Sequence, residues 1–262
     1  MEQTVVTGMV LQAAPIGEYD RRVVLLTKER GRISAFAKGA RRPNSSLLAA
    51  VNPFVFGSFT LYEGRNSNTL VSAQVSNYFS EMRENMEDAY YGFYFLELAS
   101  YYTREGQDER EMLKLLYQSI RALLSPKLPN RLVRAIYELK VICINGEAPQ
   151  VFHCVSCGKQ GAGMQFCAVR GGLLCRECAE TATDLIELDG STIYTIQYIE
   201  TRPPEKLYNF LVSEEVLHQL IRVMERYMEV YVGKRFSSLD ILESVLENQE
   251  YGRYNNSYEK IE

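Results

Sequence analysis

Apolar and polar residues alternate along residues 32–38 of this chain. Successive side chains of a strand point to opposite faces, so one face is apolar and consists of Ile33, Ala35 and Ala37. The opposite face carries two cations around one aromatic ring and consists of Arg32, Ser34, Phe36 and Lys38. The pattern predicts a strand that turns its first face to a core and its second face to the surface.

Segments rich in Val, Ile, Leu, Phe and Thr recur through the first 80 residues, and turn residues separate them. The predicted strands are Thr4–Ala14, Arg21–Thr27, Arg32–Lys38, Pro53–Tyr62 and Thr69–Asn77. Five short strands without an intervening helix favour a small barrel, and a five-stranded oligonucleotide-binding (OB) fold is the economical choice. An SH3-like barrel has a similar number of strands and stays open as an alternative.

From about Phe79 the apolar period changes to three and four residues, which predicts helices. They are expected to start at about Phe79, after Asp108, after Asn130, at Ser213 and at Ser238, and the last helix is expected to end near Leu246. Stripes of Tyr and Met on these helices are interpreted as core. The polar tail from Gln249 is expected to be disordered. The expected fold class is α+β, with a barrel followed by an all-helical domain.

The distribution of charge matters more than the net charge of −4. Residues 1–80 carry nine Lys and Arg against five Asp and Glu, a net charge of +4. The remaining 182 residues carry 20 against 28, a net charge of −8. A basic N-terminal part joined to an acidic remainder indicates a binding site for a polyanion near the start of the chain.

Between residues 21 and 42, eight Lys and Arg face a single acid, Glu29. Cations around an exposed ring, followed by a basic turn, suit a nucleic-acid backbone with a base stacked on the ring. The candidate DNA contacts are Arg21, Arg22, Arg32, Phe36, Lys38, Arg41 and Arg42. The alternative is a solvated strand face on which Phe36 only packs under a neighbouring loop.

Four cysteines form two pairs, Cys154 with Cys157 and Cys175 with Cys178, with 17 residues between the pairs. Each Cys-x-x-Cys turn directs two thiolates to one point, and two such turns complete a tetrahedron around Zn2+. A Gly-Gly turn between short apolar runs predicts a hairpin, and hence a zinc ribbon. Four thiolates leave no open coordination position, so the single ion is expected to be structural.

Other uses of these side chains have less support. A redox enzyme needs one reactive Cys-x-x-Cys, usually at a helix N-terminus, and two matched pairs disfavour it. Cys167 could compete as a ligand, but it lacks a paired spacing. His153 adjoins Cys154 and could replace a thiolate, but adjacent residues rarely ligate one metal. Cys143 is expected in the core, and His218 on a helix surface.

Several function classes lack their motifs. The sequence contains no G-x-x-x-x-G-K-[ST] or G-x-G-x-x-G loop, and neither histidine lies near a plausible nucleophile. Asp184, Glu187 and Asp189 are interpreted as a charged entry to a helix and not as a two-metal nuclease. No signal peptide is recognised, and no apolar run approaches the about 18 residues of a membrane span. We therefore expect a cytoplasmic binding protein that is not an enzyme.

The chain resembles the RecO family of bacterial DNA-repair proteins in the order of its parts and in its motifs. The motifs are Gly-Glu-Tyr-Asp-Arg-Arg at 17–22, Thr-Lys-Glu-Arg-Gly at 27–31, Ala-Lys-Gly-Ala-Arg-Arg-Pro at 37–43 and Leu-Asp-Gly at 188–190. The domains expected on this basis are an OB-fold DNA-binding domain at 1–80, a helical domain at 81–150 and 181–248, a zinc ribbon inserted at 151–180, and a tail at 249–262.

The resemblance implies a recombination mediator that binds single- and double-stranded DNA and anneals complementary strands. It implies that the chain acts with RecR, and that the two together help the RecA recombinase to displace single-stranded-DNA-binding protein. It also implies association with the nucleoid. The residues it carries over are Lys38, Arg41 and Arg42 as DNA contacts and the four cysteines as metal ligands. A zinc-ribbon protein-interaction adaptor that does not bind DNA stays as the alternative.

Overall fold

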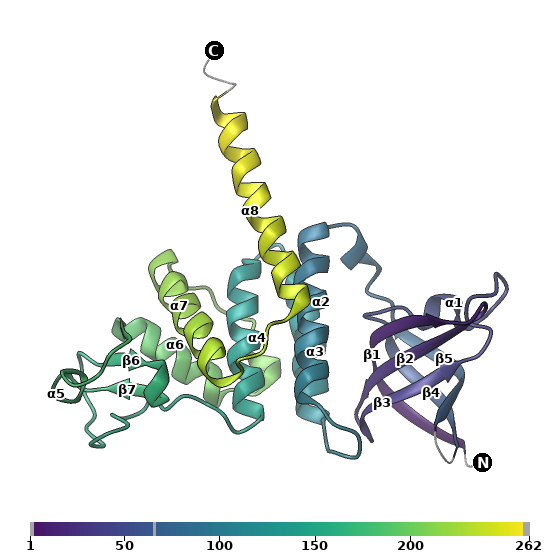
Figure 1. Ribbon diagram of the computed structural model, residues 1–262, viewed down its shortest axis with the longest axis horizontal. Helices are drawn as coiled ribbons and strands as arrows, with labels where there is room; N and C mark the ends of the chain where they lie inside the picture. Colours follow the sequence, from purple (N-terminus) through teal and green to yellow (C-terminus); the bar gives the residue numbers. More distant parts are fainter. Residues whose placement is uncertain (1–2, 65–66, 259–262) are drawn as a thin grey trace. The chain divides into compact units, whose positions relative to one another are not determined.

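A computed structural model describes residues 3–64 and 67–258 of the chain, with side chains described as far as residue 247 (Figure 1). The chain divides into two compact units. The first consists of residues 1–117 and 236–262, and the second of residues 118–235. The domain boundaries expected from the sequence, at residues 80, 150 and 180, stay a prediction. Among the described helices, none combines the length and the apolarity that crossing a membrane requires.

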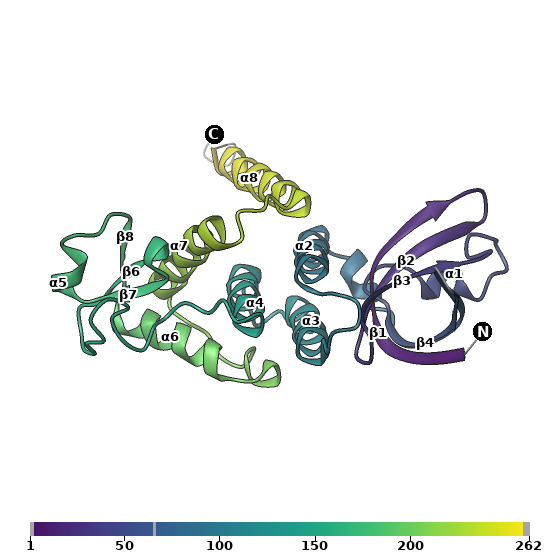
Figure 2. The same cartoon turned by 60° about the horizontal axis from the view of Figure 1, so that its bottom comes forward.

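The first unit begins with a closed barrel of five strands (Figure 1, Figure 2). The strands are β1 (Gln3–Ile16), β2 (Asp20–Thr27), β3 (Gly31–Ala37), β4 (Phe56–Glu63) and β5 (Asn68–Asn77). Their order is β1-β2-β3-β5-β4, in which β4 pairs back to β1 and only β3 and β5 run parallel. All five predicted strands are confirmed, and the closed barrel is consistent with an OB fold.

The barrel interior is made by the alternating apolar residues that the sequence marks. On β3, Ile33, Ala35 and Ala37 are fully buried, as predicted. They pack in one cluster with the inward side chains of the other strands, including Val23, Leu25, Phe59 and Leu61. Each buried Val, Leu, Ile or Phe side chain of this cluster contributes roughly 1.5–3 kcal/mol when it leaves water. The expectation of no helix among the strands was wrong, because a one-turn helix, α1 (Leu47–Ala50), adds Leu47 to the same cluster.

The first long helix of the first unit begins later than expected. Phe79 adopts a left-handed backbone and starts a 3-10 turn, η1 (Ser80–Arg83), and α2 (Met86–Tyr102) follows it. The Asn85 side chain caps α2 by accepting a hydrogen bond from the Glu87 N–H. Tyr91 and Tyr94 of α2 lie in the core, as predicted. The prediction was wrong for two other residues of the apolar stripe, Met86 and Phe93, which are 66% and 44% exposed.

Two further helices contribute to this unit. α3 (Arg110–Leu123) begins two residues after Asp108, whose carboxylate accepts a hydrogen bond from the Arg110 N–H. α8 (Ser237–Tyr258) returns to pack on α2, where the Glu97 carboxylate accepts a hydrogen bond from the Ser238 N–H at 2.9 Å. The described helix runs past the expected end near Leu246, and the last part of the predicted disordered tail, residues 259–262, lies outside the described residues.

Gly31 determines how the segment after α2 meets the barrel. Its φ is +65°, and a Cβ added there would lie 2.1 Å from the Arg104 carbonyl oxygen. That carbonyl accepts a hydrogen bond from the Arg32 N–H at 3.0 Å, and the Gly106 N–H donates to the Arg30 carbonyl at the same distance. A glycine is therefore required at this turn, both for the left-handed backbone and for the close approach.

The second unit combines helices with a small sheet. Its helices are α4 (Asn130–Ile144), α5 (Arg176–Ala179), α6 (Gly190–Thr201) and α7 (Glu214–Tyr231), with 3-10 turns η2 (Ala168–Arg170) and η3 (Pro204–Lys206). Its strands are β6 (Gln165–Cys167), β7 (Gly172–Leu174) and β8 (Leu185–Glu187), in the order β7-β6-β8. The predicted hairpin is confirmed as β6 and β7, and Ser213 caps α7 as expected.

The third strand of this sheet corrects one interpretation. Residues 184–189 were expected to form a charged entry to a helix, but Leu185–Glu187 pairs with β6. Only Asp189 has the expected role, since its carboxylate accepts a hydrogen bond from the Thr192 N–H at the start of α6. The Asp184 carboxylate instead accepts a hydrogen bond from Arg226 of α7 at 2.6 Å.

Candidate nucleic-acid interface and four-cysteine centre

Two of the predicted DNA contacts share the outer face of the barrel. Arg22 of β2 and Phe36 of β3 are cross-strand partners, so their side chains lie on the same face. Ser34, on the same side of β3, accepts a hydrogen bond from the Arg22 guanidinium at 2.9 Å. Arg22 is exposed and Phe36 is half-buried. The structure therefore brings a cation and a ring together, as the alternation predicts.

The structure places Arg21 and Arg32 elsewhere. Arg21 adjoins Arg22 on a strand and points to the opposite side, where its guanidinium donates to the Asn52 side-chain oxygen at 2.8 Å. Arg32 lies at the other end of β3 and donates to the Ser100 hydroxyl of α2 at 3.1 Å. Both side chains are half-buried and hydrogen-bonded within the first unit. Their part in DNA binding stays a prediction.

The remaining predicted contacts form an exposed basic loop, which we define as Lys38, Arg41 and Arg42. Asp20 accepts a hydrogen bond from the Gly39 N–H at 2.7 Å, and the Arg41 N–H donates to the Tyr19 carbonyl at 2.8 Å. These bonds tie the loop to the turn between β1 and β2. In the described part of the chain, none of the three cations of the basic loop forms an ion pair with a carboxylate.

Tyr19 is a residue that the sequence interpretation missed. The Arg42 guanidinium lies over its ring, 5.1 Å from the centroid, and the ring is 43% exposed. A hydrogen bond with the Glu18 carboxylate raises the pKa of Tyr19. The only signal in the sequence was its place within the motif at 17–22. An exposed aromatic therefore accompanies the basic loop as well as the β2–β3 face.

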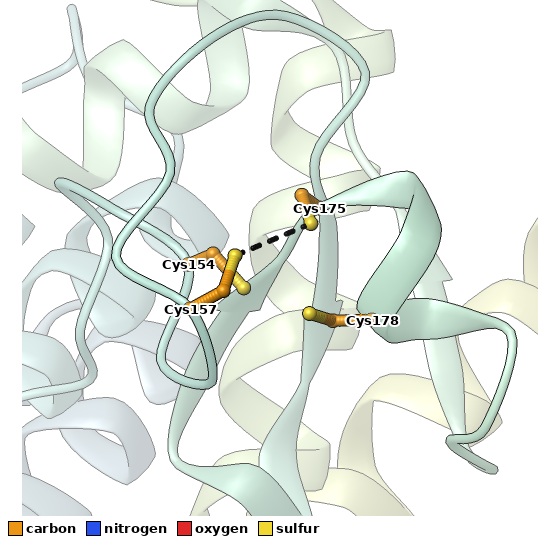
Figure 3. Close-up of side chains that lie close together, drawn as sticks. All are labelled: Cys154, Cys157, Cys175 and Cys178. Atoms are coloured by element: carbon orange, nitrogen blue, oxygen red, sulfur yellow. Dashed lines mark hydrogen bonds between the residues drawn. The ribbon is translucent and has the colours of Figure 1, made fainter.

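The four predicted metal ligands converge in the second unit (Figure 3). Cys154 and Cys157 come from the loop after α4, Cys175 is the N-cap residue of α5, and Cys178 lies within the single turn of α5. All four sulfurs lie within 4.8 Å of one another. The Sγ atoms of Cys157 and Cys175 are 3.7 Å apart. Bonds of about 2.3 Å in a tetrahedron place neighbouring sulfurs about 3.8 Å apart, so the cluster has the dimensions of a zinc site.

The protonation of the cluster favours a bound cation. Burial raises the pKa of Cys154, but hydrogen bonds from the backbone N–H groups of Cys175, Cys157 and Ser156 lower it by more. The pKa of this thiol therefore lies at about 6, below its ordinary value. Hydrogen bonds with Cys175 and Cys157 raise the pKa of Cys178 to about 12. One thiolate therefore forms readily, and its charge opposes ionisation of the others until a metal ion neutralises them.

Backbone contacts hold both pairs of cysteines in place. Gly158, in a left-handed conformation with φ of 73°, bends the chain after the first pair, and its N–H donates to the Cys154 carbonyl at 2.9 Å. The Val155 N–H donates to the Leu173 carbonyl of β7 at 2.8 Å. Lys159 forms an ion pair of 3.0 Å with Glu177, which joins the two halves of the cluster.

The remaining cysteines and histidines lie outside the cluster. Cys167 is a buried residue of β6 whose thiol donates to the Thr183 carbonyl, as expected of a strand residue. Cys143 is partly buried on α4, and burial raises its pKa to about 12. His218 is exposed on α7, as expected. Within the described residues, the four paired cysteines are the group that could hold a metal ion.

Comparison with known proteins covers nearly the whole chain. Residues 1–79 match the family described as Recombination protein O N terminal, and residues 83–240 match Recombination protein O C terminal. Three similar relatives are named DNA repair protein RecO. The relative from Alkaliphilus metalliredigens is 30% identical over 91% of this chain and 98% of its own length. The relative from Acetivibrio thermocellus is 30% identical over 91% of this chain and 96% of its own length. The relative from Bacillus subtilis is 29% identical over 91% of this chain and 94% of its own length.

The matches agree with the order of parts in the structure. The N-terminal match spans the five-stranded barrel, and the C-terminal match spans α2 to α7, the start of α8 and the four-cysteine cluster. Membership of this family supports a role in DNA repair and recombination. From its barrel, its cysteine cluster and the two matches that together span residues 1–79 and 83–240, we conclude that the chain belongs to the RecO family.

Proposed function

We propose that the chain is a recombination mediator that binds single- and double-stranded DNA and anneals complementary strands. With RecR, it helps to load RecA onto DNA covered by single-stranded-DNA-binding protein, and it is associated with the nucleoid in the cytoplasm. It acts by binding and not as an enzyme. The observation that carries the proposal is the basic loop of Lys38, Arg41 and Arg42, exposed at one end of the barrel of a RecO-family chain.

Phosphate binding by the basic loop follows from its charge. Each Lys or Arg that neutralises a phosphate releases condensed counterions, which favours binding whatever the base sequence. Two strands held on one cationic surface repel each other less, and their base edges stay free to pair. Annealing is therefore the expected consequence of a sequence-independent site.

The four cysteines are proposed to hold one zinc ion. When bound, a zinc ion with four thiolate ligands supplies a structural crosslink and no open coordination position. The cysteines of the two pairs would then fix the loop after α4 against α5. The role proposed for the ion is to stabilise the second unit.

Binding at several salt concentrations tests the proposal. The affinity of the full chain for a mixed-sequence single strand should fall linearly on a log–log plot, by about 0.7 per neutralised phosphate. Complementary oligonucleotides should anneal faster with the protein than without it. Absence of binding at low salt, or binding that does not vary with salt, would contradict the proposal.

A protein-interaction adaptor is the second candidate. It is favoured by two large apolar side chains of the second unit, Tyr194 and Leu211, which are 65% and 64% exposed and line the same hollow. An adaptor would bind partner proteins through its helices and ribbon, and would bind random single-stranded DNA weakly at any salt concentration. The salt series therefore separates the two candidates.

A further inference from the structure

A hollow of about 450 Å³ opens on the barrel beside Phe36. It lies between the outer face of β2 and β3 and the ends of β4 and β5, and all its lining residues belong to the first unit. Its size is within the about 300–1,000 Å³ typical of small-ligand sites. Phe36 is the aromatic residue of its lining.

The charges of the hollow balance. Among the described residues that line it are two arginines, Arg22 and Arg30, and two glutamates, Glu63 and Glu105, so the formal charges of these described side chains cancel. Arg30 and Glu63 form an ion pair of 2.5 Å across it. These four side chains together exert no net attraction on a phosphate group, whereas a neutral polar ring can stack on Phe36 and form hydrogen bonds with them. The hollow therefore differs in kind from the basic loop, where the cations have no carboxylate partner among the described residues.

Two side-chain oxygens in the hollow can still accept hydrogen bonds. Asn68 uses its amide nitrogen to donate to the Ser34 carbonyl at 3.2 Å, and its Oδ1 has no partner among the described residues. The Oε1 atom of Glu63 forms the ion pair with Arg30 and also accepts a hydrogen bond from the Thr4 hydroxyl. Its Oε2 atom likewise has no partner within residues 3–64 and 67–258. The site offers an aromatic face and two acceptors that have no partner among the described residues.

We propose that this hollow binds one unpaired nucleobase, stacked on Phe36 with its pairing edge toward Asn68 and Glu63. Every base carries an N–H group on the edge used for Watson–Crick pairing, so two acceptors accommodate any base. A paired base has already committed those N–H groups to its partner strand and cannot use them here. The hollow thus distinguishes single from double strands without reading sequence, and this inference rests on the proposed DNA-binding function.

The test compares three fluorescent probes on the full chain. They are a short single strand of mixed sequence, a strand of the same length that lacks bases, and a blunt duplex. The wild-type chain should bind the base-containing strand more tightly than the base-free strand, by about 5- to 150-fold for one stacked base. Phe36→Ala should reduce this ratio to about one, and leave the affinities for the base-free strand and the duplex unchanged.

Two further variants make the test specific. Asn68→Ala keeps the ring and should lower the ratio several-fold, so it serves as well if Phe36→Ala does not fold. Tyr78→Ala removes an aromatic ring that is 51% exposed in the same unit but outside the hollow, and should leave the ratio unchanged.

The possible outcomes are distinct. Equal binding of base-containing and base-free strands by the wild-type chain would overturn the inference and leave the proposed function standing. A Phe36→Ala variant that folds and keeps the full ratio would do the same. A wild-type chain that binds none of the three probes would overturn the proposed function itself.

Discussion

The guanidinium of Arg42 lies over the ring of Tyr19, 5.1 Å from its centroid. This contact joins the loop after β3 to the turn between β1 and β2, alongside the hydrogen bond from the Arg41 N–H to the Tyr19 carbonyl. The two segments are separated in sequence by all of β2 and β3. Tyr19 therefore positions a cation of the basic loop while leaving it at the surface.

Removing the ring should weaken DNA binding slightly. A cation–π contact at an exposed site is worth about 0.5–1 kcal/mol, so Tyr19→Ala is expected to lower the affinity for single-stranded DNA by about 2- to 5-fold. Tyr19→Phe keeps the ring and should bind like the wild-type chain. Fluorescence anisotropy at low salt measures both variants, and equal affinities of the alanine variant and wild type would show that the contact does not matter.

Reversing the charge of the basic loop should have a larger effect. The triple variant Lys38→Glu, Arg41→Glu and Arg42→Glu is expected to lose most DNA binding, because three phosphate-neutralising cations become anions. Any binding that remains should depend less on salt, by roughly two units of the log–log slope for a single strand. A salt titration measures both quantities.

A matched control has the same change in net charge. Arg121, Lys127 and Arg131 are exposed cations outside the barrel, and their triple replacement by Glu should leave DNA affinity close to that of wild type. Equal losses from the two triple variants would assign the effect to net charge alone. Zinc content should be unchanged in both.

Loss of one cysteine ligand should remove the metal. Cys175→Ser is expected to lower the zinc content from about one ion per chain and to lower Tm by roughly 5–10 °C, because metal binding contributes to folding. Elemental analysis and a thermal melt on the same sample measure the two effects. Cys167→Ala is the control, since this buried thiol lies outside the cluster, and it should keep its metal. Full metal content in Cys175→Ser would show that the ligand set is wrong.

Glu200 should make the stability of the second unit depend on pH. Burial raises the pKa of its carboxyl to about 8, and the nearby Lys140 ammonium offsets this only in part. Lys140 instead donates to the backbone carbonyls of Ile199 and Glu200, at 3.2 Å and 2.7 Å. The folded chain therefore keeps a proton that the unfolded chain releases near pH 4.5. The stabilisation is complete below that pH and is lost as the pH rises toward 8.

Glu200→Gln removes this titration. The free energy of unfolding of the variant should equal that of wild type near pH 4 and exceed it by about 1–2 kcal/mol at pH 8. This difference is smaller than the full pKa shift implies, because the carboxyl is partly exposed and solvent screens it. Urea unfolding of both chains across this range measures the difference. Parallel stability curves for the two chains would rule out a raised pKa for Glu200.

Features with a local cause could be predicted from the sequence. The alternation of Ile33, Ala35 and Ala37 sets the inner face of β3, because a period of two cannot fit another element. The spacing of the cysteine pairs likewise determines the metal cluster. The opposite directions of Arg21 and Arg22 follow from the same alternation, although the sequence interpretation grouped both on one binding face.

Features that depend on distant partners could not be predicted in this way. Arg32 meets the Ser100 hydroxyl, 68 residues further along the chain, and no local pattern marks that contact. β8 is a strand because β6 offers it an edge, whereas its own three residues are too few to carry a period. The hollow beside Phe36 needs Asn68 and Glu63 from two other strands, and only the closed barrel brings them together.

The first unit is built from both ends of the chain, and this imposes an order on its completion during protein synthesis. Phe236 packs against the rings of Tyr94 and Tyr101, and Ser238 meets Glu97, so α2 lacks this covering until residue 236 leaves the ribosome. At about 5–20 residues per second, the intervening 118–235 segment takes roughly 6–24 s to make. An aromatic surface of α2 therefore stays uncovered beside a newly made barrel until residues 236–238 have been made.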